Sequence, residues 1–157
     1  MQELDVTQDM VDKAQRKSKE MGVLNNSITY GDGNLVGFIG EQIAKQILGG
    51  TERNTYDFDL VLPSGVTVDV KTKKTGVAPK EHYDCSVAAF NTKQRCDYYC
   101  FVRVKSDLTK AWFLGMYPKK QYYEDARFLK KGDYDGDNGY VVKADCYNMQ
   151  ISKLHHV

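Results

Sequence analysis

The hydrophobic pattern of this chain changes its period near residue 50, and this change limits the folds that the chain can adopt. Over residues 34–48 the apolar side chains recur at helical spacing, and two glycines follow as a natural helix end. Residues 56–62 and 66–73 then have the character of two strands joined by a Pro-Ser-Gly turn. A helix that leads into a β-hairpin predicts a fold that combines helices with a sheet.

The remaining segments extend this α+β, or mixed α/β, prediction along the chain. An amphipathic helix is expected over residues 5–21, before an Asn- and Gly-rich loop at 25–33. A short helix is expected from Pro118 to about Arg127, since proline fits the first turn of a helix. The acidic run at 133–139 is expected to be a polar turn and not a Ca²⁺ loop. Further strands are expected at residues 83–90, 98–105, 111–117 and, at a sheet edge, 147–154.

The composition indicates one globular domain spanning residues 1–157, with 41% hydrophobic and 27% charged residues. Its parts are the N-terminal helix, a core over about 34–117, and a C-terminal helix and strand over 118–154. No apolar run reaches the roughly 18 residues of a membrane span, and the N-terminus is too polar for a secretory signal. We therefore expect a soluble cytoplasmic protein (in the host cytoplasm if viral) with no membrane partner.

The cysteines and the net charge restrict the partners only weakly. None of the four cysteines forms a CxxC pair, which favours buried free thiols in a reducing compartment. The net charge of +1 counts mildly against a nucleic-acid partner. Lysines gather near the predicted hairpin and again after residue 118, so a locally basic face is compatible with the sequence.

Acidic residues and one lysine gather around the predicted hairpin. Strand alternation puts Asp69 and Lys71 on one side, and Asp57 and Asp59 on a common face of the neighbouring strand. The turn can bring one of these aspartates beside Asp69, and a helix packed across the sheet can deliver Glu41. Carboxylates so close together need a cation. Because all the ligands are oxygen atoms, we expect Mg²⁺, with Mn²⁺ able to substitute.

A cluster of this kind suits the hydrolysis of phosphodiester bonds. Bound Mg²⁺ lowers the pKa of a water ligand and holds the non-bridging phosphate oxygens. An ammonium group beside the metal can orient that water and offset charge on the phosphate, and a neutral amine could accept its proton. Lys71 is the candidate for this role.

The order of these residues resembles the PD-(D/E)XK nuclease superfamily, whose fold is restriction-endonuclease-like. In that superfamily a Glu on a helix precedes an Asp at the start of one strand and (D/E)-x-K on the next. Glu41, Asp57 and Asp69-Val70-Lys71 match this order, with Tyr56 in place of the proline. The likeness covers about residues 34–154 and includes segments similar to small phage nucleases: Phe113–Pro118, Ala126–Gly132 and Tyr147–Leu154.

The resemblance implies a central mixed sheet flanked by helices, and a metal-dependent deoxyribonuclease. It implies that Asp57, Asp69 and the Val70 carbonyl bind the metal. Glu41 would bind it directly or through water, and Lys71 would serve the nucleophile.

Four residues outside this core motif are further candidates. Asp59 is the alternative metal ligand to Asp57, which is preferred because the family's acid usually stands at the strand start. Lys73 and Lys74 continue the strand toward DNA phosphates, and Gln94 is placed where it could face the site and contact DNA.

Several functional alternatives stay open. The enzyme could be an endonuclease or an exonuclease in DNA processing, repair or recombination. A domain this small favours structure-selective or weakly sequence-specific cutting, because it has little material for base readout. Cutting both strands with one site per chain would favour a homodimer. The alternatives are a catalytically inactive DNA-binding or assembly module of the same fold, and an unrelated α+β interaction domain.

Overall fold

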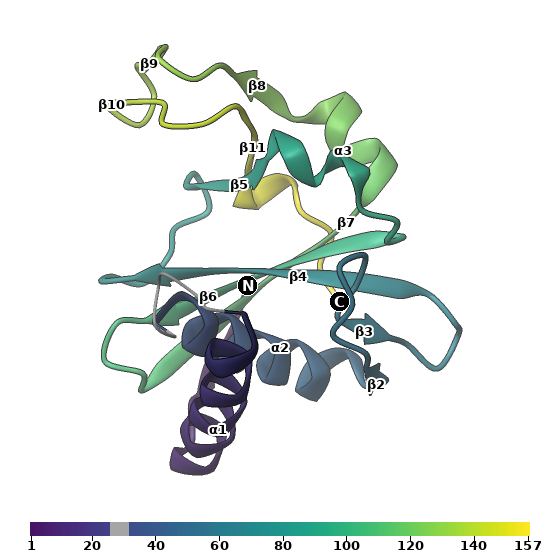
Figure 1. Cartoon of the computed structure of the whole chain (residues 1–157). Coiled ribbons are helices and arrows are strands. Elements are labelled where there is room, and N and C mark those ends of the chain that lie inside the picture. Colours follow the sequence, from purple (N-terminus) through teal and green to yellow (C-terminus); the bar gives the residue numbers. More distant parts are fainter. Residues whose placement is uncertain (26–31) are drawn as a thin grey trace.

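A computed structural model describes residues 1–25 and 32–157 and shows three layers (Figure 1). Helices α1 (Gln8–Asn25) and α2 (Asp32–Leu48) cover one face of a six-stranded mixed sheet. A small sheet and helix α3 (Lys119–Asp125) lie on the other side. This arrangement confirms the α+β class; its restriction-endonuclease-like character stays a prediction. None of the helices in the described ranges is long and apolar enough to cross a membrane.

The main sheet has the strand order β1-β7-β6-β4-β3-β2. Strands β4 and β6 are parallel, and the other neighbours are antiparallel. The first strand was not predicted, and its pairing with β7 explains why α1 begins later than expected. The six strands are β1 (Gln2–Asp5), β2 (Thr51–Glu52), β3 (Leu60–Val61), β4 (Thr67–Thr75), β6 (Tyr98–Lys105) and β7 (Lys110–Pro118).

The small sheet corrects the expectation for the end of the chain. Strand β11 (Cys146–Gln150) was expected at an edge, but it lies between β5 (Asp84–Ala88) and β8 (Arg127–Leu129). It ends at Gln150 because a 3-10 turn begins at the next residue. The run expected as a polar turn, 133–139, includes strand β9 (Tyr134–Asp135) and the turn that joins it to strand β10 (Tyr140–Val141). The 3-10 helices are η1 (Ala89–Lys93) and η2 (Ile151–Lys153).

The other predicted elements agree with the structure to within a few residues, with one exception. Of the strand expected over 56–62, only Leu60–Val61 pairs with β4. The residues before it form a turn in which the Thr55 hydroxyl group donates to the Phe58 carbonyl at 2.9 Å. This local hydrogen bond replaces strand pairing. Residues 26–31 of the loop expected at 25–33 lie outside the described residues.

The sheet separates two hydrophobic cores. Along β6 the side chains of Cys100 and Val102 pack toward the helices, whereas Tyr99 and Phe101 pack toward the small sheet. The four cysteines all lie in the described residues and are buried free thiols, as the sequence predicted. Because both faces of β4 and β6 are covered over much of their length, Asp69 and Arg103 on these strands lie in a poorly solvated environment.

Helix α2 lies very close to β4 at Gly40. A Cβ atom there would lie 1.9 Å from Oγ1 of Thr72, so only glycine allows this distance between helix and strand. The next residue, Glu41, is therefore held against the sheet and is 9% exposed. This confirms the expectation that a helix packed across the sheet delivers Glu41.

Candidate active site

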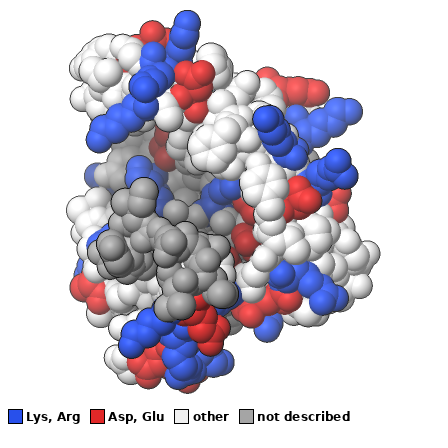
Figure 2. Space-filling model, viewed as in Figure 1, with Lys and Arg blue, Asp and Glu red and all other residues white. Residues whose placement is uncertain are grey.

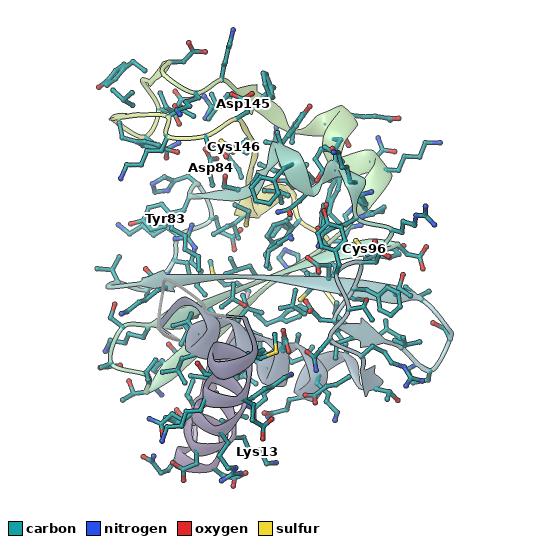
Figure 3. All side chains as sticks on the ribbon, viewed as in Figure 1. Lys13, Tyr83, Asp84, Cys96, Asp145 and Cys146 are labelled. Carbon is teal, nitrogen blue, oxygen red and sulfur yellow. The ribbon has the colours of Figure 1, made fainter. Side chains whose placement is uncertain are left out.

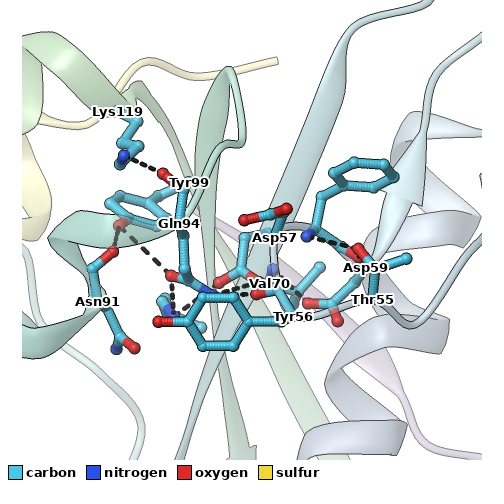
Figure 4. Close-up of polar contacts among 12 residues, drawn as sticks. Thr55, Tyr56, Asp57, Asp59, Val70, Asn91, Gln94, Tyr99 and Lys119 are labelled. Carbon is cyan, nitrogen blue, oxygen red and sulfur yellow. Dashed lines mark hydrogen bonds and ion pairs between the residues drawn. The ribbon is translucent and has the colours of Figure 1, made fainter.

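Three carboxyl groups meet where α2, β4 and the turn before β3 come together. Glu41 comes from α2, Asp59 from the turn and Asp69 from β4. Asp59 interacts with both of the others, each within hydrogen-bonding reach when one partner carries a proton. The Val70 N–H also donates to Asp59 Oδ2 at 2.8 Å (Figure 4). The three acids therefore form a connected row with Asp59 in the middle.

Burial and mutual repulsion make these carboxyl groups hard to ionise. Desolvation, followed by the charges of Glu41 and Asp69, raises the pKa of Asp59 from 3.8 to about 8. Desolvation also raises the pKa of Glu41 and of Asp69, although a lysine beside each opposes the effect. Repulsion of this kind is what a bound cation would relieve.

Lys71 lies against Asp69 and is held by three groups. Its Nζ is 2.7 Å from Asp69 Oδ2 and donates to Gln94 Oε1 at 3.0 Å. It also lies 5.3 Å from the centre of the Tyr99 ring. Asp69 is only 5% exposed, so this pair is not a charge ladder on a wet sheet face. The Asp-x-Lys motif is thus a buried and oriented ion pair.

Gln94 joins the two members of this ion pair. Its amide group donates to Asp69 Oδ1 at 3.2 Å and to the Tyr56 carbonyl at 2.9 Å, while its oxygen accepts from Lys71 (Figure 4). The side chain does face the site, as predicted. Because Gln94 is 6% exposed and its amide is engaged inside the protein, a direct contact with DNA is not what this geometry favours.

Asp57 is placed differently from the expectation. Its Oδ1 accepts the Arg95 N–H at 3.0 Å, so it anchors the segment that precedes β6. Because residues 56–59 form a turn, Asp57 and Asp59 do not share a strand face. The groups that raise the pKa of Asp59 most, after burial, are Glu41 and Asp69. We therefore take Asp59, and not Asp57, as the candidate metal ligand.

The remaining predicted residues occupy different faces of β4. Alternation along the strand puts Lys73 on the side of Asp69 and Lys71, and Lys74 on the opposite side. Both lysines are exposed. Val70 presents its N–H to Asp59, and the ligand role of its carbonyl stays a prediction. The two lysines expected to contact DNA therefore project from opposite faces of β4, and their contact with DNA stays a prediction.

One member of the site was not predicted from the sequence. Lys17 of α1 has its Nζ 3.3 Å from Glu41 Oε2 and 4.5 Å from the centre of the Phe38 ring. Nothing in the spacing of Lys17 indicates this partner, because 24 residues separate it from Glu41. Only the packing of α1 against α2 brings the two together.

The carboxylate oxygen atoms of the site are suitable ligands for a hard divalent cation, but their positions do not form a metal site. In the part of the chain that the structure describes, no three His, Cys, Asp or Glu side chains form a ready metal site. Instead, Lys17 and Lys71 are paired with the two outer carboxylates. Three adjacent carboxyl groups with raised pKa values are the oxygen ligands that Mg²⁺ prefers. Binding would require Lys71 and Lys17 to release the oxygen atoms that they now hold.

Comparison with known proteins identifies no family for this chain. No protein-family model matches it, and no curated protein is similar to it in sequence.

Proposed function

We propose that this protein is a metal-dependent deoxyribonuclease of the PD-(D/E)XK type. One observation carries the proposal: three carboxyl groups from separate elements, those of Glu41 and Asp69 buried and that of Asp59 half-buried, converge beside the lysine of an Asp-x-Lys motif. An ordinary structural core gains nothing from three adjacent acids whose ionisation burial opposes. A site that binds a cation and a phosphate does gain from them.

Each residue of the site would have its own role in the reaction. Asp59 and Asp69, together with Glu41, would hold Mg²⁺, which when bound supplies a Lewis acid for the phosphate oxygens and an acidified water. Lys71 is oriented by Gln94 and donates hydrogen bonds, so it can position the attacking water and offset charge on the scissile phosphate. The aromatic ring of Tyr99 beside Lys71 restricts the space open to its amine.

DNA is the proposed partner, cut in a structure-selective or weakly sequence-specific manner during processing, repair or recombination. The proposed setting is the cytoplasm, with cleavage of both strands of a duplex requiring two chains. A homodimer would meet that need, and each chain would contribute one site.

The direct test is incubation of the protein with linear, circular, single-stranded and branched DNA in the presence of Mg²⁺ or Mn²⁺. We expect cleavage that EDTA abolishes, and products that separate endonuclease from exonuclease action. Lys71→Ala and Asp69→Asn should remove cleavage while circular dichroism shows a folded protein. Wild-type rates in either variant would mean that the site lies elsewhere.

A second candidate is a catalytically inactive DNA-binding or assembly module. The ion pair of Lys71 with Asp69 favours it, since a charge-neutral pair can stabilise this part of the sheet without a metal. Isothermal titration with Mn²⁺ separates the two: the nuclease binds Mn²⁺ at Asp59 and Asp69, and the module does not.

A further inference from the structure

The carbonyl groups at the end of η1 are held by two side chains from other elements. The last carbonyl groups of a helix have no partner within it. Here the Asn91 carbonyl accepts the Tyr99 hydroxyl group at 3.2 Å, and the Gln94 carbonyl accepts the Lys119 ammonium group (Figure 4). The same ammonium group donates to the Thr92 carbonyl at 2.9 Å. The segment that carries Gln94 is therefore fixed from β6 and from α3.

Lys119 binds the backbone on both sides of a change in its direction. Residues 89–93 form η1, whereas Gln94 is extended, with φ −63° and ψ 147°. One ammonium group thus bridges the last turn of η1 and the first extended residue after it. The peptide groups on either side of the Gln94 side chain cannot rotate without breaking these hydrogen bonds. The position of that side chain therefore depends on Lys119.

Lys119 is itself held in place at the junction of β7 and α3. Its backbone N–H donates to the Asp97 carbonyl at 2.9 Å. Tyr122, later in the same short helix, is fully buried. Cys96 belongs to the same hydrophobic core, which lies between the main sheet and the small sheet (Figure 3). The side chain of Lys119 therefore extends from a well-packed part of the protein.

The Lys119 ammonium group has no acidic partner that would explain its position. In the part of the chain that the structure describes, it forms no ion pair with a carboxylate. Its two acceptors are carbonyl groups in an exposed and a partly buried position, where water can also serve as the donor. What the lysine adds is a fixed distance between α3 and Gln94.

The effect of this contact reaches Lys71 through Gln94. Gln94 Oε1 accepts from Lys71 Nζ, and the amide group donates to Asp69 Oδ1. We propose that Lys119 is a positioning residue of the candidate active site, because it holds Gln94 where Gln94 orients Lys71. The inference rests on the proposed nuclease function for the reaction that Lys71 serves. A reacting group that is held in one orientation needs less reorganisation to reach the transition state.

The test observes the Lys71 ammonium group directly, in the full chain and without DNA or metal. Its nitrogen-15 NMR signal, assigned with Lys71→Arg, gives the rate of hydrogen exchange with water in EDTA. We expect Lys119→Met to raise this rate about tenfold, the effect of losing one hydrogen bond of a charged group. Gln94→Ala should raise it as much. Lys119→Arg keeps a cation with several donors and should retain the wild-type rate.

Lys120→Met is the matched control, because it removes the same charge from the next residue of α3. Lys120 is exposed, and α3 carries two lysines and two acidic residues. Figure 2 shows acidic and basic side chains side by side over the region where α3 lies in Figure 1. The two variants therefore change the charge of this surface equally. In Lys120→Met the exchange rate of Lys71 should stay at its wild-type value.

An unchanged exchange rate of Lys71 in folded Lys119→Met would overturn the inference, and so would an equal increase in Lys120→Met. If Lys119→Met does not fold, the wild-type protein decides through its own Lys119 signal. That ammonium group should exchange about tenfold more slowly than the ammonium group of Lys120. Equal exchange rates of the two lysines would overturn the inference.

Cleavage assays with Mg²⁺ separate this inference from the nuclease proposal. Lys119→Met should lower kcat about tenfold and leave KM for DNA unchanged, as expected for a residue that acts through another. Cleavage with an unchanged kcat in this variant would overturn the role of Lys119 and leave the nuclease. Absence of cleavage by the wild-type protein would overturn the nuclease, and the exchange rates would still decide whether Lys119 holds Lys71 in place.

Discussion

The carboxylate of Asp59 accepts a hydrogen bond from the backbone N–H of Val70 at 2.8 Å. This bond ties the turn before β3 to the middle residue of the Asp-x-Lys motif. It fixes Asp59 beside Asp69, although nine residues, including a hairpin turn, lie between them. The same bond stabilises the ionised form of Asp59, against the larger effects of burial and of its two acidic neighbours.

Substitution of the two aspartates of the turn should separate their roles. Asp59→Asn should lower Mg²⁺-dependent cleavage by at least about 100-fold, because the loss of a ligand exceeds the roughly 10–100-fold cost of an outer partner. Asp57→Asn should keep most activity, since Oδ1 of Asp57 accepts the Arg95 N–H and an amide oxygen can do the same. Cleavage rates under saturating Mg²⁺ measure both. The reverse ranking would restore Asp57 as the ligand.

The stability of the metal-free protein should fall as the pH rises from about 4 to about 8. The pKa of Asp59 is higher in the folded protein, about 8, than its ordinary value of 3.8. A group with a raised folded pKa contributes its stability below the unfolded pKa and loses it as pH rises toward the folded pKa. Burial shifts the pKa of Glu41 and Asp69 in the same direction.

Thermal unfolding in EDTA across this pH range measures the effect. In Asp59→Asn the midpoint temperature should fall less steeply with pH and be higher at pH 8 than in the wild type, because an amide cannot ionise. In Asp57→Asn the midpoint temperature should depend on pH as it does in the wild type. A wild-type midpoint that increases with pH over this range would show that Asp59 ionises easily in the folded protein.

Gln94 should act by positioning Lys71 and not by binding DNA. Gln94→Ala removes the acceptor of Lys71 and the donor to Asp69, so kcat should fall about 10–100-fold. KM for DNA should change little, since the side chain is buried. Gln121→Ala, at an exposed position of α3, is the control for loss of a glutamine. An increase in KM at constant kcat would instead support the predicted DNA contact.

The contact of Gly40 with Thr72 should limit substitution on α2. Gly40→Ala would place Cβ 1.9 Å from Thr72 Oγ1, and we expect a loss of about 1–3 kcal/mol in the free energy of unfolding. Gly37→Ala is the matched control, because a Cβ atom there meets nothing within 4 Å. It should stabilise the helix by up to about 1 kcal/mol. Chemical denaturation of the two variants measures the difference.

A displaced helix should also move Glu41, so Gly40→Ala is expected to lower cleavage as well as stability. Adding Thr72→Ala removes the two nearest atoms and should recover part of both. Full activity of Gly40→Ala alone would mean that the position of Glu41 is not set by this contact.

Most of the fold could be predicted because local sequence patterns decide it. The helical spacing before Gly49, the turn before Val66 and the continuous run of strand-forming residues in β6 each act over a few residues. Pairings that depend on distant segments were missed. Strand β1 forms only because it adds to the edge of β7, and β11 is central only because β5 and β8 arrive on both sides.

In the candidate site, too, local patterns could be predicted and contacts between distant segments could not. The sequence by itself determined that Asp69 and Lys71 share a face, because residues two apart in a strand always do. Only the tertiary structure showed that Asp59, and not Asp57, lies beside Asp69, since the Val70 N–H holds Asp59 and the Arg95 N–H holds Asp57. The role of either residue as a metal ligand stays a prediction. Contacts between distant segments also supplied Lys17 and Gln94, because the charge and burial of a side chain depend on neighbours that the chain brings in by folding.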